Sequence, residues 1–216
     1  MRPVGIALVL VFVLSAGRAE APKGTAIFNG KDLTGWEGLT DYWSVKDGAL
    51  VGASPKDGLK FNTFLCSKQK YGDFELKFQV RLTGDLTQAN SGVQIRSELK
   101  EREHFVVWGP QCDMGQQYWA SLYGEHFGQK EIGKGGFMKA ADPEVVKKVL
   151  KPGEFNDYHI KAVGKHVTIK LNGATTVDAD FDNLPADGII AWQIHSGPRM
   201  EVVFKDIAFT DLSKRP

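Results

Sequence analysis

The segment "DFELKFQVRL" (residues 73–82) indicates the fold more clearly than any other part of the 216-residue chain. Apolar side chains occupy every second position, namely Phe74, Leu76, Phe78, Val80 and Leu82, and the positions between them are polar. Successive side chains of a β-strand project to opposite faces. The segment therefore predicts a strand with one face in a core and the other in solvent.

Two dipeptides that favour tight hairpin turns accompany further strand patterns. Asn172-Gly173 interrupts "HVTIKLNGATTVDAD" (166–180), and Asp47-Gly48 separates "YWSVK" from "ALVGA". Both dipeptides favour the primed turns that match the twist of paired strands. With a last strand predicted in "MEVVFKDIAF" (200–209), the chain is expected to be all-β: an antiparallel β-sandwich or jelly roll.

One short helix is predicted in "ADPEVVKKVLKPGE", with Asp142 as N-cap and Pro143 in the first turn. The sequence shows no internal repeat and no linker between domains. We therefore expect a single domain over residues 22–216.

Residues 1–21 resemble a secretory signal peptide. Arg2 forms a short basic region, an apolar run from Val4 to Leu14 follows, and small residues come next. The run is too short to cross a membrane. We expect an exported protein, periplasmic or extracellular, that is soluble after cleavage.

The net charge of the chain is +1, and its basic residues are scattered. Binding to nucleic acid requires clustered Lys and Arg, so nucleic acid is not expected as a partner.

Cys66 and Cys112 are the two cysteines. In an exported protein they could form a disulfide, or they could be two small buried residues.

Three strand-like segments repeat one arrangement of polar residues. Each carries a glutamine and a charged or titratable residue on one face, with apolar residues on the other: Gln94, Arg96 and Glu98; Gln111 and Asp113; Gln193 and His195. If these strands are neighbours, Arg96, Asp113 and His195 converge on one solvated sheet face. Inert surface positions are the alternative explanation.

Aromatic residues follow the Asp113 segment. Tyr118, Trp119 and Tyr123 could pack against the apolar faces of sugar rings while the amides and charged groups bind hydroxyls, or some of them could fill the core. No phosphate loop or dinucleotide fingerprint is found, so no cofactor is expected. No metal is expected either; a metal held by Asp113 and His195 is the alternative, but two ligands on separate strands do not identify one.

Several motifs in order resemble the 3-keto-disaccharide hydrolase family, whose members are described as 3-keto-glucoside lyases and 3-keto-2-hydroxyglucal hydratases. The motifs run from about Thr25 to Asp211: "FNGKDLTGW", "YWSVKDGALVGA", "YGDFELKFQVRL", "NSGVQIRS", "GPQCDMG", "KPGEFNDYHIKAVGKHVTIKLNG" and "QIHSGPRMEVVFKDI". The resemblance implies a concanavalin A-like jelly roll, and an exported enzyme that acts on an oligosaccharide or glycoside.

In such chemistry a base removes the C2 proton beside the 3-keto group, the C1 substituent leaves, and water adds back. We expect His195 as the base. Arg96 is expected to stabilise the enolate, and Asp113 to orient His195 or to act as its acid–base partner. The remaining candidates would bind or enclose the sugar: Gln94, Glu98, Gln111, Gln193, Tyr118, Trp119 and Tyr123.

Two other functions remain open from the sequence. One is a carbohydrate-binding module without catalysis, because sandwiches of this shape serve both purposes. The other is an ordinary glycoside hydrolase that uses Glu98 and Asp113 as its two carboxylates.

Overall fold

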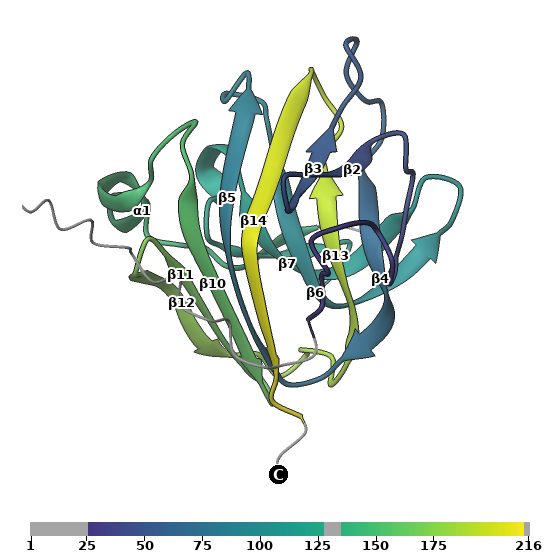
Figure 1. The fold of residues 1–216 in the computed structure, drawn as a ribbon. Coiled ribbons are helices and arrows are strands. Elements are labelled where there is room, and N and C mark those ends of the chain that lie inside the picture. The colour runs from purple at the N-terminus through teal and green to yellow at the C-terminus, as the bar shows by residue number, and fades with distance from the viewer. Residues whose placement is uncertain (1–25, 128–134, 214–216) are drawn as a thin grey trace, which may run out of the picture.

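The computed structural model describes residues 26–127 and 135–213, so the predicted signal peptide lies outside the described residues. Two seven-stranded antiparallel sheets face each other (Figure 1). This confirms the predicted β-sandwich. Within the described residues, no helix has both the length and the apolar character needed to cross a membrane.

Sheet A carries the candidate polar residues. Its strands, in spatial order, are β1 (Trp36–Glu37), β4 (Thr63–Tyr71), β13 (Gly188–Ile194), β6 (Ser91–Glu101), β7 (Val106–Met114), β8 (Leu122–Glu125) and β9 (Gly136–Lys139). Sheet B contains β12 (Ala174–Asp180), β11 (His166–Leu171), β10 (Asn156–Val163), β5 (Phe74–Gly84), β14 (Met200–Asp211), β3 (Ala49–Ala53) and β2 (Trp43–Lys46).

The core lies between the two sheets and is rich in aromatic rings. Phe78 of β5 stacks on Tyr158 at a centroid distance of 5.3 Å and meets Trp192 of β13 edge-on at 5.3 Å. All five alternating apolar residues of the 73–82 segment are buried, as predicted. Aromatic pairs of this kind contribute about 1 kcal/mol beyond the burial of their area.

Both predicted hairpin turns form. Asp47 and Gly48 have φ values of 52° and 79°, and Asn172 and Gly173 have 47° and 85°. Positive φ at both central residues is the signature of the type I′ turn. The predicted helix is α1 (Pro143–Val149), and the Asp142 side chain accepts a hydrogen bond from the Glu144 N–H at 2.9 Å.

The two cysteines are free and buried. Cys112 belongs to the core between the sheets, whereas Cys66 packs with Phe64, Val107 and Ala191 in a separate apolar cluster. Burial raises the pKa of Cys66 to about 12, with Glu37 adding to the effect. Both residues are therefore the small buried kind, not a disulfide.

The β6–β7 hairpin bends back over the outer face of sheet A, the face turned away from sheet B. Leu99 and Phe105 of this hairpin pack against the Cys66 cluster, and the His104 ring lies 4.2 Å from the Phe61 ring. Arg102 reaches Glu37 on β1, with Nη1 3.1 Å from Oε2. The hairpin thereby buries part of a face that would otherwise be solvated.

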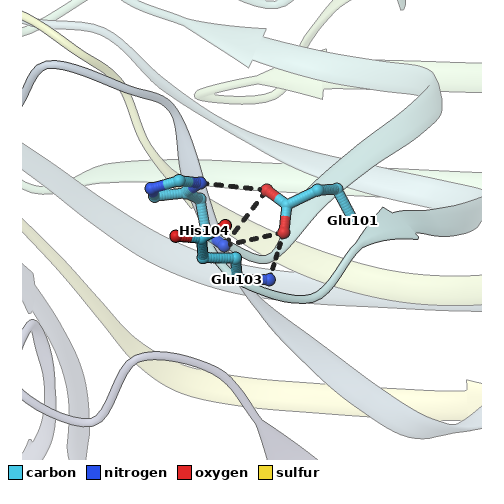
Figure 2. A group of neighbouring side chains, drawn as sticks. All are labelled: Glu101, Glu103 and His104. Carbon is cyan, nitrogen blue, oxygen red and sulfur yellow. Dashed lines mark hydrogen bonds and ion pairs between the residues drawn. The ribbon is translucent and has the colours of Figure 1, made fainter.

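A carboxylate closes the tip of this hairpin (Figure 2). The Glu101 side chain accepts hydrogen bonds from the backbone N–H groups of Glu103 and His104, and its Oε2 lies 3.1 Å from His104 Nδ1. Ligand atoms of these three residues lie within 4.8 Å of one another, a spacing that could suit a metal ion. The hydrogen bonds of the turn already account for the grouping.

Candidate functional site

Strand β6 does not alternate regularly, and this changes the predicted site. Its pairing with β7 shifts register between Gln94 and Glu98, and Arg96 has a φ of 48°. Such a bulge turns the following side chains out of the alternation that the sequence pattern assumes. Gly188 of β13 accommodates the bulge, because a Cβ atom there would lie 2.2 Å from the Arg96 carbonyl carbon.

Arg96 therefore does not join the other predicted catalytic residues. Its side chain is fully buried, and it donates to the carbonyl oxygens of Gly72, Gly164 and Pro185 at 2.6–3.0 Å and to Asp73 Oδ1 at 2.9 Å. These partners lie in three different connections between strands. The expectation that Arg96 stabilises an enolate is therefore corrected. Its guanidinium N–H groups are used in hydrogen bonds that link three loops.

Glu98 is also displaced from the predicted face. Its side chain is 70% exposed and forms an ion pair with Lys100, whose Nζ lies 2.6 Å from Oε2. It has no contact with Asp113 among the described interactions. The bulge that redirects Arg96 accounts for this difference too.

The three glutamines do come together, as a chain of amides across neighbouring strands. The side-chain amides of Gln94 and Gln111 are hydrogen-bonded at 3.1 Å, and those of Gln111 and Gln193 at 3.1 Å. Gly92 makes room for this arrangement, because a Cβ atom there would lie 2.6 Å from Gln111 Cγ and Cδ. Ser97 Oγ extends the chain, 2.6 Å from the Gln94 side-chain amide.

These amides are buried rather than solvated, with at most 1% of each residue exposed. The prediction that these glutamines lie on a solvated face is therefore wrong, because their side-chain amides are buried and hydrogen-bond mainly to one another. One atom is left over: Gln193 Nε2 is buried and has no hydrogen-bond partner among the described residues. A buried unpaired amide costs about 1–3 kcal/mol, so the Gln193 end of the chain is where an incoming polar group would be stabilised.

Asp113 lies beside this end of the chain, opposite Gly92 in the sheet. Its carboxylate accepts hydrogen bonds from the Met114 N–H at 2.9 Å and from Asn90 Nδ2 at 3.3 Å. Burial raises the pKa of Asp113 well above its ordinary value, and the charge of Glu125 raises it further. The raised pKa favours the protonated form of Asp113, which is the form that can act as an acid.

His195 follows β13 directly and is half-buried. Its Nδ1 lies 2.6 Å from the carbonyl oxygen of Ser196. A carbonyl can only accept, so Nδ1 carries the proton and the neutral ring keeps its basic lone pair on Nε2.

His195 and Asp113 approach the site from different strands. No described hydrogen bond joins them, and β6 lies between β13 and β7. Two strand spacings place the backbones roughly 10 Å apart. Asp113 therefore does not orient His195 directly.

Glu125 and Asn62 are functional candidates that the sequence reading missed. Asn62 donates to Glu125 Oε1 at 3.3 Å and accepts from the Ser196 N–H at 2.8 Å. Glu125 also lies 3.8 Å from His126 Nε2. This connects the His195 segment to β8. The alternation of Tyr123 and Glu125 in "LYGE" matches the Gln111 and Asp113 pattern and could have revealed the pair.

The predicted aromatic wall forms in part. Tyr118, on the short 3-10 helix η1 (Gln116–Tyr118), meets Tyr123 edge-on at 5.8 Å and stacks on Phe137 of β9 at 5.2 Å. Trp119 is instead buried in the core, because the η1 turn after β7 directs it inward. Phe137, which was not predicted from the sequence, joins Tyr118 and Tyr123 as the third aromatic residue of this group, and it is 41% exposed.

Solved structures support the same fold. A glycosyl hydrolase candidate from Parabacteroides distasonis is similar with a TM-score of 0.61 and 22% identity, covering 86% of this chain and 92% of its own. The carbohydrate binding module CBM66 from Bacillus subtilis has a TM-score of 0.58 and 15% identity, covering 82% of this chain and 95% of its own. At these identities the similarity shows the sandwich fold alone.

Comparison with curated proteins finds no match. A profile of the 3-keto-alpha-glucoside-1,2-lyase-like domain, in contrast, matches residues 23–210, which is nearly the whole chain. This agrees with the order of motifs found in the sequence. The chain therefore belongs to the 3-keto-alpha-glucoside-1,2-lyase-like domain family, a carbohydrate-acting family.

Proposed function

We propose that the protein cleaves 3-keto-glycosides by elimination followed by hydration. A 3-keto group makes the C2 proton acidic, because the neighbouring carbonyl accepts the charge as an enolate. The C1–O bond then breaks, and the leaving oxygen takes a proton. Water adds across the resulting C1–C2 double bond, so the net change is hydrolysis. Export through the predicted signal peptide would place this activity outside the cytoplasm.

The observation that carries the mechanism is the buried Asp113 carboxyl group with its raised pKa. Elimination needs an acid to protonate the leaving oxygen, and a buried carboxyl group whose pKa is raised is suited to that role. Asn90 and the Met114 N–H both bond to Oδ1, and the Gln111 side chain also bonds to the carboxyl group.

His195 is the proposed base. Its Nδ1–H is held by the Ser196 carbonyl, so Nε2 is available to take the C2 proton. The base and the acid sit on strands separated by β6. This separation suits a sugar ring placed between them, with C2 toward His195 and the glycosidic oxygen toward Asp113.

A second candidate function rests on Glu125, whose charge acts on Asp113. A pair of carboxyl groups facing the scissile bond is the equipment of ordinary glycoside hydrolases. In that reaction Asp113 would be the acid and Glu125 the nucleophile or base, and the substrate would be an unoxidised glycoside.

Steady-state kinetics on a matched glucoside and 3-keto-glucoside test the proposal. We expect turnover of the 3-keto-glucoside only, with His195→Ala and Asp113→Asn each lowering kcat by about 10²–10⁴-fold. The exposed Glu98→Gln variant is the matched control and should retain wild-type turnover.

Three results would contradict the proposal. Nearly full turnover by the His195→Ala variant would show that His195 is not the base. Cleavage of the plain glucoside, lost in both Asp113→Asn and Glu125→Gln, favours the two-carboxylate hydrolase. Binding of both sugars with no turnover of either favours a carbohydrate-binding module.

A further inference from the structure

A cavity lies beside the β6–β7 hairpin of sheet A. Its volume is about 560 Å³, within the range of small-molecule sites. Leu99 and Trp108 of the hairpin line it, together with Lys68 of β4 and Ile189 of β13. None of the residues predicted to bind sugar, apart from the displaced Arg96 and Glu98, lines this cavity.

The cavity has an excess of positive charge. Lys68, Lys70, Lys100 and Arg102 line it together with the buried Arg96, against the three carboxylates Glu37, Glu98 and Asp187. The buried Arg96 is already neutralised by Asp73, which is not part of the lining.

Each of the three carboxylates already has a cation. Arg102 pairs with Glu37 at 3.1 Å, Lys100 with Glu98 at 2.6 Å, and Lys70 with Asp187 at 4.0 Å. Lys68 is exposed and makes no ion pair with any described residue. The Lys68 ammonium group is therefore the cation in excess. A concave surface concentrates the electric field of such a charge, which favours binding of an anion.

Apolar surface accompanies this charge. Leu99, Trp108 and Ile189 are half-buried residues of the lining. Sugars present apolar C–H faces as well as polar edges, so a ligand with both a pyranose ring and a negative group matches the two kinds of surface. An inorganic anion would use only the lysines.

We propose that this cavity binds an acidic sugar unit, a pyranose that bears a carboxylate or a sulfate group. Lys68 would pair with the acidic group, and the apolar wall would contact the ring. The cavity adjoins the candidate site, because Ser97 lines it and bonds to Gln94, and His126 lines it beside Glu125.

The test is binding without turnover, so its outcome is independent of the proposed reaction. Methyl glucuronide, glucose 6-sulfate, methyl glucoside and acetate are each titrated into the full chain. Tryptophan fluorescence is the readout, because Trp108 lines the cavity while the other four tryptophans are buried. A Trp108→Phe variant should remove the signal.

We expect at least one of the acidic sugars to bind more tightly than methyl glucoside, and acetate to give no signal. Lys68→Ala should weaken that binding about fivefold, and 0.5 M salt should weaken it as well. The control is Lys46→Ala, an exposed lysine on β2 of the other sheet, which should bind like the wild type.

The two acidic sugars identify the acidic group: glucuronide alone indicates a carboxylate site, and the 6-sulfate alone a sulfate site. Equal binding of the neutral and acidic sugars would overturn the proposal. So would identical behaviour of Lys68→Ala and Lys46→Ala, or a signal from acetate as strong as that from the sugars.

Discussion

Asp113 shows how a single buried residue can connect stability with chemistry. The carboxyl group is 3% exposed and lies where the Glu125 charge disfavours its ionisation. Hydrogen bonds from Met114, Asn90 and Gln111 only partly offset these effects on the pKa. Keeping such a group in the interior is a cost that a purely structural position would avoid.

This cost predicts a pH-dependent stability. Because the pKa of Asp113 is higher in the folded than in the unfolded chain, the folded state binds the extra proton. The resulting stability is fully present below the unfolded pKa of about 4 and is lost as the pH rises through the folded pKa. Asp113→Asn does not titrate, so the variant should become more stable relative to wild type as the pH rises.

Urea unfolding of both proteins at pH 4, 6 and 8 measures this difference. A stability difference that stays constant across the three pH values would show that the folded Asp113 is not perturbed. If the wild type instead became more stable relative to the variant as the pH rises, the pKa of Asp113 would be lowered on folding, contrary to this account.

At the scale of elements, the bulge in β6 decides which residues meet. Regular alternation puts Gln94, Arg96 and Glu98 on one face, and the register shift after Gln94 separates them. The strands, the hairpin turns and the helix cap follow from local patterns, so they were predictable. The bulge depends on Gly188 of a distant strand, and the sequence pattern of β6 alone does not reveal it.

Arg96 then becomes a structural link, and this predicts a large effect on stability. Arg96→Met removes donors to three loop carbonyls and to Asp73 while keeping the chain length. Loss of one partner of a buried, hydrogen-bonded pair costs about 3–5 kcal/mol. We expect a loss of this size in the free energy of unfolding, measured by urea titration.

The matched control is Arg102→Met in the same hairpin. Arg102 is 70% exposed in an ion pair with Glu37, so its loss should cost no more than about 1 kcal/mol. Equal stability of the two variants would contradict the structural role of Arg96. An Arg96→Met protein of wild-type stability that lacks activity would restore the catalytic role expected from the sequence.

At the scale of the whole molecule, sheet A supplies the candidate chemistry and sheet B closes the core behind it (Figure 1). The order of motifs along the chain was enough to predict the sandwich and the family. The burial of Gln94, Gln111 and Gln193 was not predictable, because their amides bond to one another across three strands that are distant in the sequence. Glu125 was not predicted as a site residue, because it is linked to the site by a hydrogen bond from Asn62, which lies 63 positions away in the sequence.

The central claim is that cleavage begins at the C2 proton, and deuterium incorporation tests it most directly. The protein is incubated with a 3-keto-glucoside in D₂O and the reaction is followed by NMR, with 3-keto-glucose incubated alone to measure spontaneous exchange. The account predicts that the 3-keto-glucose released carries deuterium at C2 from the first turnover, faster than the spontaneous exchange. Release of 3-keto-glucose with its C2 proton retained would contradict it.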